Sequence, residues 1–269
     1  LFYTTLATFV CTLFRGQFSS FPNINIRGGV CYFLWNSLYD NNKNYSTVIT
    51  IEKGGKHTSI KRPLKIQNLD IFIRHSQAIS ILKKTIEFNE KPISEIISPR
   101  RPFGIDANIV KDNDTFNNET TNNKILCLGK GQNFGYINKK LIKTHEEWVQ
   151  KWKLYVPRAN NIGTELNDDN LNSVIGKPGT VCTESYIIIG INIELNEQQC
   201  KSISKYLKTK FARFMHSLAK ASQYATAKTY RFIPMQDFNE EWNDEKLYKK
   251  YGLSEEEIAY IESMIRPME

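Results

Sequence analysis

Three lysines are spaced so that they would share one face of a helix. Lys201, Lys205 and Lys208 follow one another at steps of four and three residues, in a segment whose apolar residues also recur at helical spacing. Like charges on neighbouring turns repel one another mildly unless an anion lies opposite them. The spacing therefore indicates either a helix that lies along a phosphate backbone, with Arg213 further along it, or an ordinary solvated lysine face.

A second set of basic residues falls at predicted turns and strand ends. The main chain can approach a ligand closely at a turn, so basic side chains there suit contacts with phosphates or base edges. Taken alone, each of them is more often a solubilising surface charge. The chain has 36 Lys and Arg against 28 Asp and Glu, and its net charge of +8 favours an anionic partner, most often nucleic acid. The residues of this set are Arg100, Arg101, Lys130, Arg158 and Lys177.

No motif indicates a catalytic, cofactor-binding or metal-binding centre. Gly129-Lys130-Gly131 lacks the Lys-Ser/Thr pair and the glycine spacing of a Walker A loop, and neither GxGxxG nor GxSxG identifies another site. The four histidines are scattered and form no zinc-binding spacing. The five cysteines are odd in number and include no CxxC pair, which is typical of reduced residues in a cytoplasmic protein.

The hydrophobic pattern predicts an α+β fold, with mixed sheets and flanking helices. An apolar run at residues 30–35 indicates a strand buried on both faces, entered through the Gly28-Gly29 kink. Asn196 with Gln199, and Ser254 with Glu257, have the spacing of capping boxes that begin helices. Polar loops, the first of them expected to be exposed and mobile, are predicted at residues 111–123 and 160–172. Further strands are predicted at 47–52, 58–61, 125–128, 134–137, 154–157, 186–193 and 230–234, and helices at 76–88, 144–152, 196–222 and 254–265.

The amino-terminal stretch gives little positive information. The chain begins at Leu1 rather than at methionine, which suggests a fragment or a processed product. Residues 1–14 are apolar but too few to span a bilayer, and they lack the features of a signal peptide. We therefore expect no membrane association.

From Phe21 onward the chain resembles the carboxy-terminal part of bacterial restriction–modification N6-adenine DNA methyltransferases, including fused endonuclease–methylase relatives. Residues 26–35 (IRGGVCYFLW) look like the strand that follows the catalytic core of that family. Residues 101–105 (RPFGI) look like the start of its target-recognition part. The third likeness begins at residue 174 and includes YLKTKFARF and the tail from FIPMQDF to the end of the chain.

The resemblance implies a target-recognition domain over residues 61–269, preceded by the end of a catalytic-type sheet in residues 1–60. In that family S-adenosylmethionine sits on an F-x-G-x-G turn and the target adenine is held by an N-P-P-Y loop, and neither motif occurs here. The implied cofactor and the transfer chemistry would therefore belong to an upstream methyltransferase domain. The implied partners of this chain are that domain and double-stranded DNA, and base flipping would finish in the upstream pocket.

Two other classes of function stay open at this point. One is a complete DNA endonuclease whose site the sequence does not reveal, because residues that meet in space need not be neighbours in sequence. The other is a basic protein-interaction module whose lysine face binds an acidic protein. A third possibility is that the lysine helix only packs against another domain, in which case charge reversal on it would change DNA binding little.

Overall fold

The computed structural model describes residues 6–12, 16–18, 21–26, 30–35, 45–51, 57–66, 69–160, 172–222 and 224–268. The chain forms two compact units, Leu1–Lys84 and Thr85–Glu269. The division predicted at residue 60 falls inside strand β6 (His57–Arg62). The glycine kink and nearly all of the polar loop predicted at 160–172 lie outside the described residues.

The first unit contains a four-stranded sheet in the order β4-β1-β5-β6. Strand β1 pairs antiparallel with β4 and parallel with β5, and β5 and β6 form the predicted antiparallel hairpin. The strand predicted at 30–35 is confirmed, but the prediction that both its faces are buried is wrong at Phe33, which is 60% exposed. The strands are β1 (Leu6–Thr12), β2 (Gly16–Phe18), β3 (Phe21–Ile26), β4 (Val30–Trp35), β5 (Ser46–Ile51) and β6, with β2 and β3 paired apart from the sheet. Helix α1 (Ala78–Glu87) follows, as predicted.

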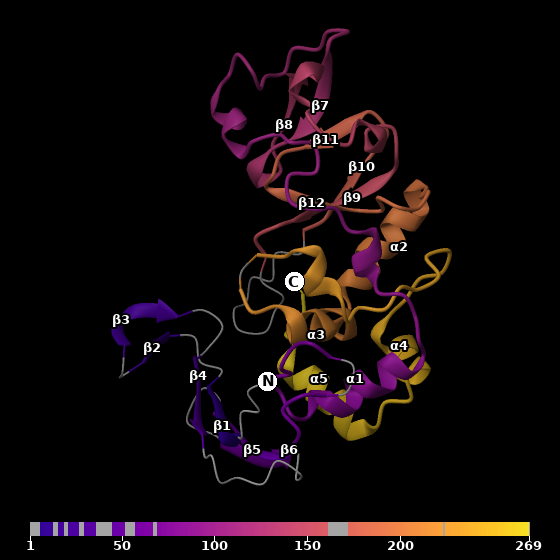
Figure 1. Cartoon of the computed structure of the whole chain (residues 1–269). Coiled ribbons are helices and arrows are strands. Elements are labelled where there is room, and N and C mark those ends of the chain that lie inside the picture. The colour runs from indigo at the N-terminus through magenta and orange to yellow at the C-terminus, as the bar shows by residue number, and fades with distance from the viewer. Residues whose placement is uncertain are drawn as a thin grey trace, which may run out of the picture. The chain divides into compact units, whose positions relative to one another are not determined.

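Two small sheets make up the first part of the second unit (Figure 1). In one, β9 lies between β10 and β12 and is antiparallel to both. In the other, β7 lies between β11, which is parallel to it, and β8, which is antiparallel. The chain therefore passes from one sheet to the other after β10 and returns after β11. The strands are β7 (Lys124–Leu128), β8 (Phe134–Asn138), β9 (Lys153–Pro157), β10 (Val174–Gly176), β11 (Thr180–Cys182) and β12 (Tyr186–Ile189).

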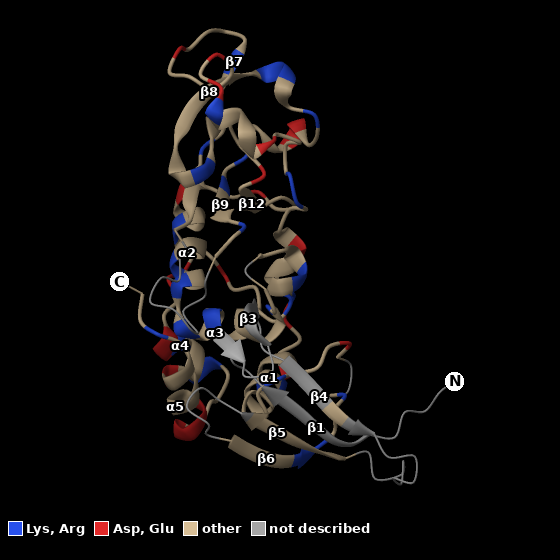
Figure 2. Ribbon diagram, turned by 90° about the vertical axis from the view of Figure 1, so that its left-hand side faces the viewer, with Lys and Arg blue, Asp and Glu red and all other residues tan. Residues whose placement is uncertain are grey.

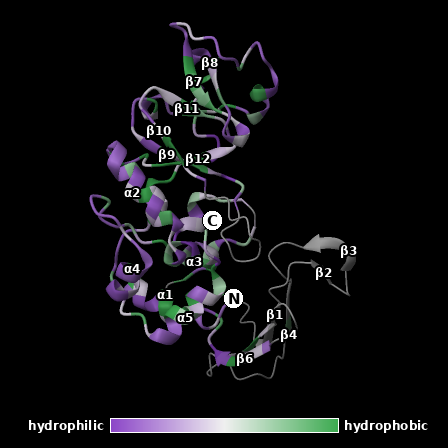
Figure 3. Cartoon of the chain, turned by 180° about the vertical axis from the view of Figure 1, so that it is seen from behind, coloured by the Kyte–Doolittle hydropathy of each residue, from purple (hydrophilic) through white to green (hydrophobic). Residues whose placement is uncertain are grey.

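A hydrophobic core joins these sheets and fixes the segments between them. Cys127 and Ile137 from one sheet, and Tyr155 and Ile188 from the other, are almost fully buried in one cluster together with Phe103. The ribbon is correspondingly hydrophobic along β7 and β9 (Figure 3). The mixed sheets and the helices that follow them confirm the α+β prediction.

The helix predicted from Asn196 to about Ser222 is two helices, α2 (Glu197–Lys208) and α3 (Lys210–Ala219). The capping box of Asn196 and Gln199 is confirmed at the start of α2. Thr209 leaves the helical conformation and its side chain caps α3 by accepting from the amide of Ala212. The carboxylate of Asp244 accepts from the amides of Lys210 and Phe211 as well, so the break is held from a distant part of the chain.

Two more helices, α4 (Asp244–Lys250) and α5 (Glu255–Met264), end the described chain, and α5 begins with the predicted Ser254–Glu257 capping box.

The helix predicted at 144–152 is wrong, because only the 3-10 turn Glu146–Trp148 forms there, after His145 in the left-handed conformation. The strand predicted at 230–234 is also wrong. The remaining 3-10 turns are Ile93–Ile96, Ala107–Lys111, Lys130–Gln132, Lys139–Leu141 and Ala227–Tyr230. Among the described residues, no helix has the length and hydrophobicity that crossing a membrane requires.

The polar loop at residues 111–123 is exposed as predicted, but one aromatic residue anchors it to the sheet. Phe116 packs against the glycines of β8 and of the turn before it, and a Cβ on Gly135 would lie 2.6 Å from the ring of Phe116. The main chain of Asn117 also exchanges hydrogen bonds with that of Tyr136 on β8. The loop is therefore held against the edge of the sheet by backbone pairing and by packing on glycine.

We expect Gly135→Ala to destabilise the second unit by about 1–3 kcal/mol, because the added methyl group overlaps the ring of Phe116. Chemical denaturation of the variant and the wild type measures the difference. Phe116→Leu in the Gly135→Ala background should recover part of the loss, since the smaller side chain makes room. A Gly135→Ala protein as stable as the wild type would contradict the packing described for this loop.

Candidate nucleic-acid interface

Residues 183–186 carry the chain from β11 back to β12, and we call them the crossover segment. They form hydrogen bonds with several neighbouring turns. The amide of Thr183 donates to the carbonyl of Leu128 at 3.0 Å, and the amide of Glu184 donates to that of Ile105 at 2.9 Å. The carbonyl of Ser185 accepts from the amide of Arg158, and the hydroxyl of Tyr186 accepts from the amide of Gln132. The turns that carry Arg100, Arg101, Lys130 and Arg158 thus bond to the crossover segment, either directly or through a nearby residue.

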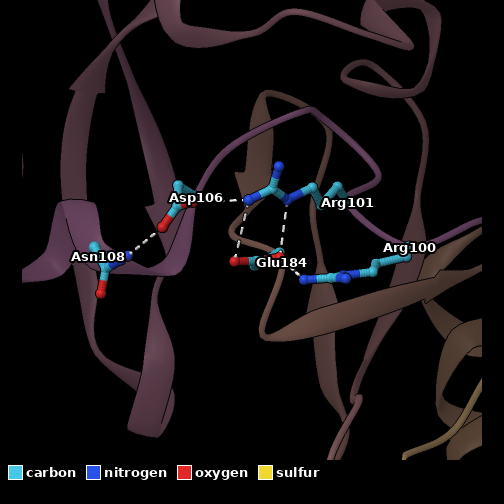
Figure 4. Close-up of polar contacts among 5 residues, drawn as sticks. All are labelled: Arg100, Arg101, Asp106, Asn108 and Glu184. Atoms are coloured by element: carbon cyan, nitrogen blue, oxygen red, sulfur yellow. Dashed lines mark hydrogen bonds and ion pairs between the residues drawn. The ribbon is translucent and has the colours of Figure 1, made fainter.

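Two of the predicted arginines meet a carboxylate of this segment (Figure 4). Nε of Arg101 donates to Oε2 of Glu184 at 2.8 Å, and Nη2 of Arg100 donates to the same oxygen at 2.8 Å. Nη2 of Arg101 also donates to Asp106 at 2.7 Å, whose other oxygen accepts from the amide of Asn108 and caps a 3-10 turn. Arg101 has a backbone φ of +58°, which is uncommon outside glycine, so these contacts hold a residue in a costly conformation.

Arg101 and Arg100 lower the pKa of Glu184. The hydrogen bond from Arg101 is the main reason that the pKa of Glu184 falls to about 2, with Arg100 contributing in the same direction. Both arginine side chains stay about half exposed, while that of Glu184 is only 14% exposed. A guanidinium has five donors, so each arginine can still donate to an incoming acceptor while the carboxylate fixes its direction.

Lys130 and Arg158 belong to turns whose backbone amides bond to the crossover segment. Lys130 is exposed in the turn between β7 and β8, next to Gln132, whose amide is bonded to Tyr186. Arg158 follows β9, and its guanidinium lies 4.4 Å from the centre of the Tyr224 ring. The structure therefore brings together Arg100, Arg101, Lys130 and Arg158 around the crossover segment, and we refer to these four as the turn group.

Lys177 and the three lysines of α2 form a separate set, which we call the helix group. Lys201 pairs with Glu197 at 2.8 Å and Lys205 with Glu241 at 2.5 Å, and all four of these side chains are about half exposed. Lys208 is exposed and pairs with no carboxylate among the residues that the structure describes. Figure 2 shows basic residues along α2, so the predicted lysine face exists, although two of its charges are paired within the protein.

Lys177 is positioned by a buried lysine. Nζ of Lys153 donates to the carbonyls of Val149, Lys151 and Lys177, and the last of these bonds measures 3.4 Å. Burial lowers the pKa of Lys153 to about 8. At the start of α2, the pKa of Glu197 is lowered chiefly by Lys201 and also by the charge of Lys177.

The assignment of Arg213 to the interface has to be corrected. Its side chain is 2% exposed, and its Nε donates to the carbonyl of Lys208 at 3.1 Å. The break at Thr209 separates Arg213 from the lysines of α2, so the continuous stripe predicted from the sequence does not form. Arg213 supports the corner between α2 and α3 and cannot reach a phosphate in this conformation.

Sequence reasoning missed the two acidic residues that orient the turn group. Glu184 and Asp106 lie far from each other in sequence and carry no motif, so only the fold shows that they converge on Arg101. Within the described ranges, no three His, Cys, Asp or Glu side chains gather in a way that could hold a metal ion. Cys127, Cys182 and Cys200 are free thiols in the core, and burial raises the pKa of Cys127 to about 12.

Comparisons with known proteins show a distant structural similarity. No known family and no curated protein matches the chain. Among solved structures, the type IIG restriction endonuclease BpuSI is similar at a TM-score of 0.39 and 10% sequence identity. The similarity covers 93% of this chain and 39% of the chain of that enzyme, so the protein spans about two fifths of the length of its structural relative.

The arginine contacts predict a pH-dependent contribution of Glu184 to stability. Its pKa is lowered from 4.5 to about 2 in the folded protein, so its stabilisation is present above pH 4.5 and is lost as the pH falls toward 2. We expect Glu184→Gln to reduce the free energy of unfolding by about 1 kcal/mol at pH 7 and by less at pH 3. Urea denaturation at both pH values measures this difference.

Glu119→Gln serves as the matched control for this measurement. The Glu119 side chain is 82% exposed and lies 3.7 Å from Lys124, so its loss should change stability little at either pH. A Glu184→Gln defect that is as large at pH 3 as at pH 7 would show that the carboxylate charge is not what Arg100 and Arg101 require.

Proposed function

We propose that this chain binds double-stranded DNA as the target-recognition part of an adenine-specific DNA methyltransferase of a restriction–modification system. The observation that carries the proposal is that the turns holding Arg100, Arg101, Lys130 and Arg158 all bond to the crossover segment between the two sheets. The net charge of +8 and the sequence likeness at residues 26–35, 101–105 and 174 onward support it. S-adenosylmethionine and the transfer step would belong to an upstream domain.

The two basic groups suit different tasks in such a domain. The helix group presents flexible ammonium groups from one exposed helix face and one turn, which suits phosphates because phosphate contacts position a protein on the duplex without reading sequence. Within the turn group, Arg100 and Arg101 present guanidinium groups whose direction is set by Glu184 and, for Arg101, also by Asp106. Such groups suit base edges, because reading them requires fixed donor geometry.

Fluorescence anisotropy with a pool of random-sequence duplexes at low and moderate salt tests the proposal. Binding that weakens steeply with salt is expected, because each phosphate contact releases counterions. Binding to an acidic protein that DNA does not compete away would instead favour an interaction module. Cleavage of DNA that depends on a divalent metal would favour an endonuclease.

We expect Lys205→Glu with Lys208→Glu to weaken duplex binding and to flatten its salt dependence. If both lysines bind phosphates, the slope of log K against log salt should become shallower by about 0.9 for each phosphate that is no longer neutralised. Titrations at several salt concentrations measure affinity and slope together.

The control is Lys228→Glu with Lys249→Glu, which changes the net charge equally at two exposed lysines outside both basic groups. This variant should keep most of the slope, because it removes no proposed phosphate-binding lysine. An unchanged affinity and slope in the Lys205/Lys208 variant would remove α2 from the proposed interface and leave its lysines as a solvated face.

A further inference from the structure

The turn between β7 and β8, residues 129–133, holds an exposed amide side chain on an unusually constrained backbone. Among the described residues, the non-glycine residues with positive φ are Asn89, Arg101, Gln132 and His145. Arg101 and Gln132 both bond to the crossover segment, one through Glu184 and the other through Tyr186. Backbone conformations of this kind persist only where surrounding contacts maintain them, and they concentrate at functional sites.

Several bonds fix the backbone of Gln132 while leaving its side chain outside. The amide of Gln132 donates to the hydroxyl of Tyr186 at 3.0 Å, and Tyr186 is 3% exposed in the core between the sheets. Gly131 before it also has a positive φ, and the amide of Gly129 donates to the carbonyl of Asn133 at 2.7 Å to close the turn. The side chain of Gln132 is exposed, and its amide nitrogen makes only a long contact of 3.5 Å with the carbonyl of Asn172.

Asn117, an amide residue of the polar loop at residues 111–123, is less suitable. The side-chain nitrogen of Asn117 donates to the carbonyls of Asn113 and Asp114, and its side-chain oxygen accepts from Nζ of Lys124. Asn117 therefore holds its own loop together. Gln132 differs because its position is fixed through the main chain, so its carboxamide is not needed for the turn.

We propose that the 129–133 turn enters the major groove and that Gln132 reads one base pair of the target, with adenine as its preferred partner. The inference rests on the proposed function. A glutamine carboxamide can donate to N7 and accept from N6 of adenine at the same time, and this pair discriminates against the other bases. Lys130 lies within the turn and the exposed Phe134 follows it directly, so a phosphate-binding group and an apolar surface lie near the amide in the chain. Tyr186 is a positioning residue, since it acts on DNA only through the backbone of Gln132.

The test is selection and sequencing of duplexes bound by the wild type and by Gln132→Gly, Gln132→Glu and Tyr186→Phe variants. Glycine adopts positive φ freely, so Gln132→Gly should keep the turn and lose only the amide. We expect the preference of this variant for one base over the others to fall by about tenfold or more at one base pair, with the rest of the selected motif unchanged. Gln132→Glu should move the preference at that pair toward cytosine, whose amino group donates to a carboxylate. Tyr186→Phe should weaken discrimination at the same pair.

Asn118→Ala is the matched control, because it removes another exposed amide from the polar loop. It should leave the pair read by Gln132 unaffected, and thermal unfolding of all variants confirms that they are folded. Wild-type protein that binds no duplex at low salt overturns the proposed function and this inference with it. Wild-type binding without any selected motif, a motif unchanged by Gln132→Gly, or loss of the same pair in Asn118→Ala overturns the inference alone.

Discussion

The backbone hydrogen bonds of the crossover segment are the constraint on which the turn group depends. The chain must leave one sheet after β10, add β11 to the other and return to form β12, and residues 183–186 make that return. Thr183 and Tyr186 are buried at the two ends of this short path, so its course is set by the core. Between them, the amide of Glu184 donates to the carbonyl of Ile105 and the carbonyl of Ser185 accepts from the amide of Arg158, so two turns are bonded to this path. The packing that joins the sheets therefore also determines which turns lie together.

Local signals in the sequence were enough for most of the elements but not for the contacts between them. The strands at 125–128, 134–137 and 154–157 are confirmed because short apolar runs between turn residues have few other solutions. The capping boxes at Asn196 and Ser254 are confirmed because both partners lie within one turn. The pairing of Glu184 with Arg100 and Arg101 depends on how the two sheets are connected, and no local pattern encodes it.

The division of the long helix at Thr209 shows why periodicity alone misplaced Arg213. The apolar residues from Cys200 to Leu218 keep helical spacing across the break, so they look like one face of a single helix. They do so because α2 and α3 each bury one face. Thr209 can cap a helix, but a threonine inside a helical pattern is common and does not by itself end one. The second capping group, the carboxylate of Asp244, comes from far along the chain. A buried Arg213 at the corner is the consequence of that distant contact.

The strengths of the existing ion pairs indicate which of them a phosphate can replace. Lys205 and Glu241 form a pair between half-exposed side chains, and such pairs contribute only about 0–1 kcal/mol, so a phosphate can displace the carboxylate at little cost. Glu184 is different, since it is mostly buried and accepts from two guanidinium groups at once. Displacing Glu184 from Arg100 and Arg101 would cost the charge-assisted hydrogen bonds that lower its pKa. The helix group is therefore suited to exchanging partners when an anion arrives, whereas Arg100 and Arg101 are suited to keeping their bonds to Glu184 and meeting the anion with donors already in place.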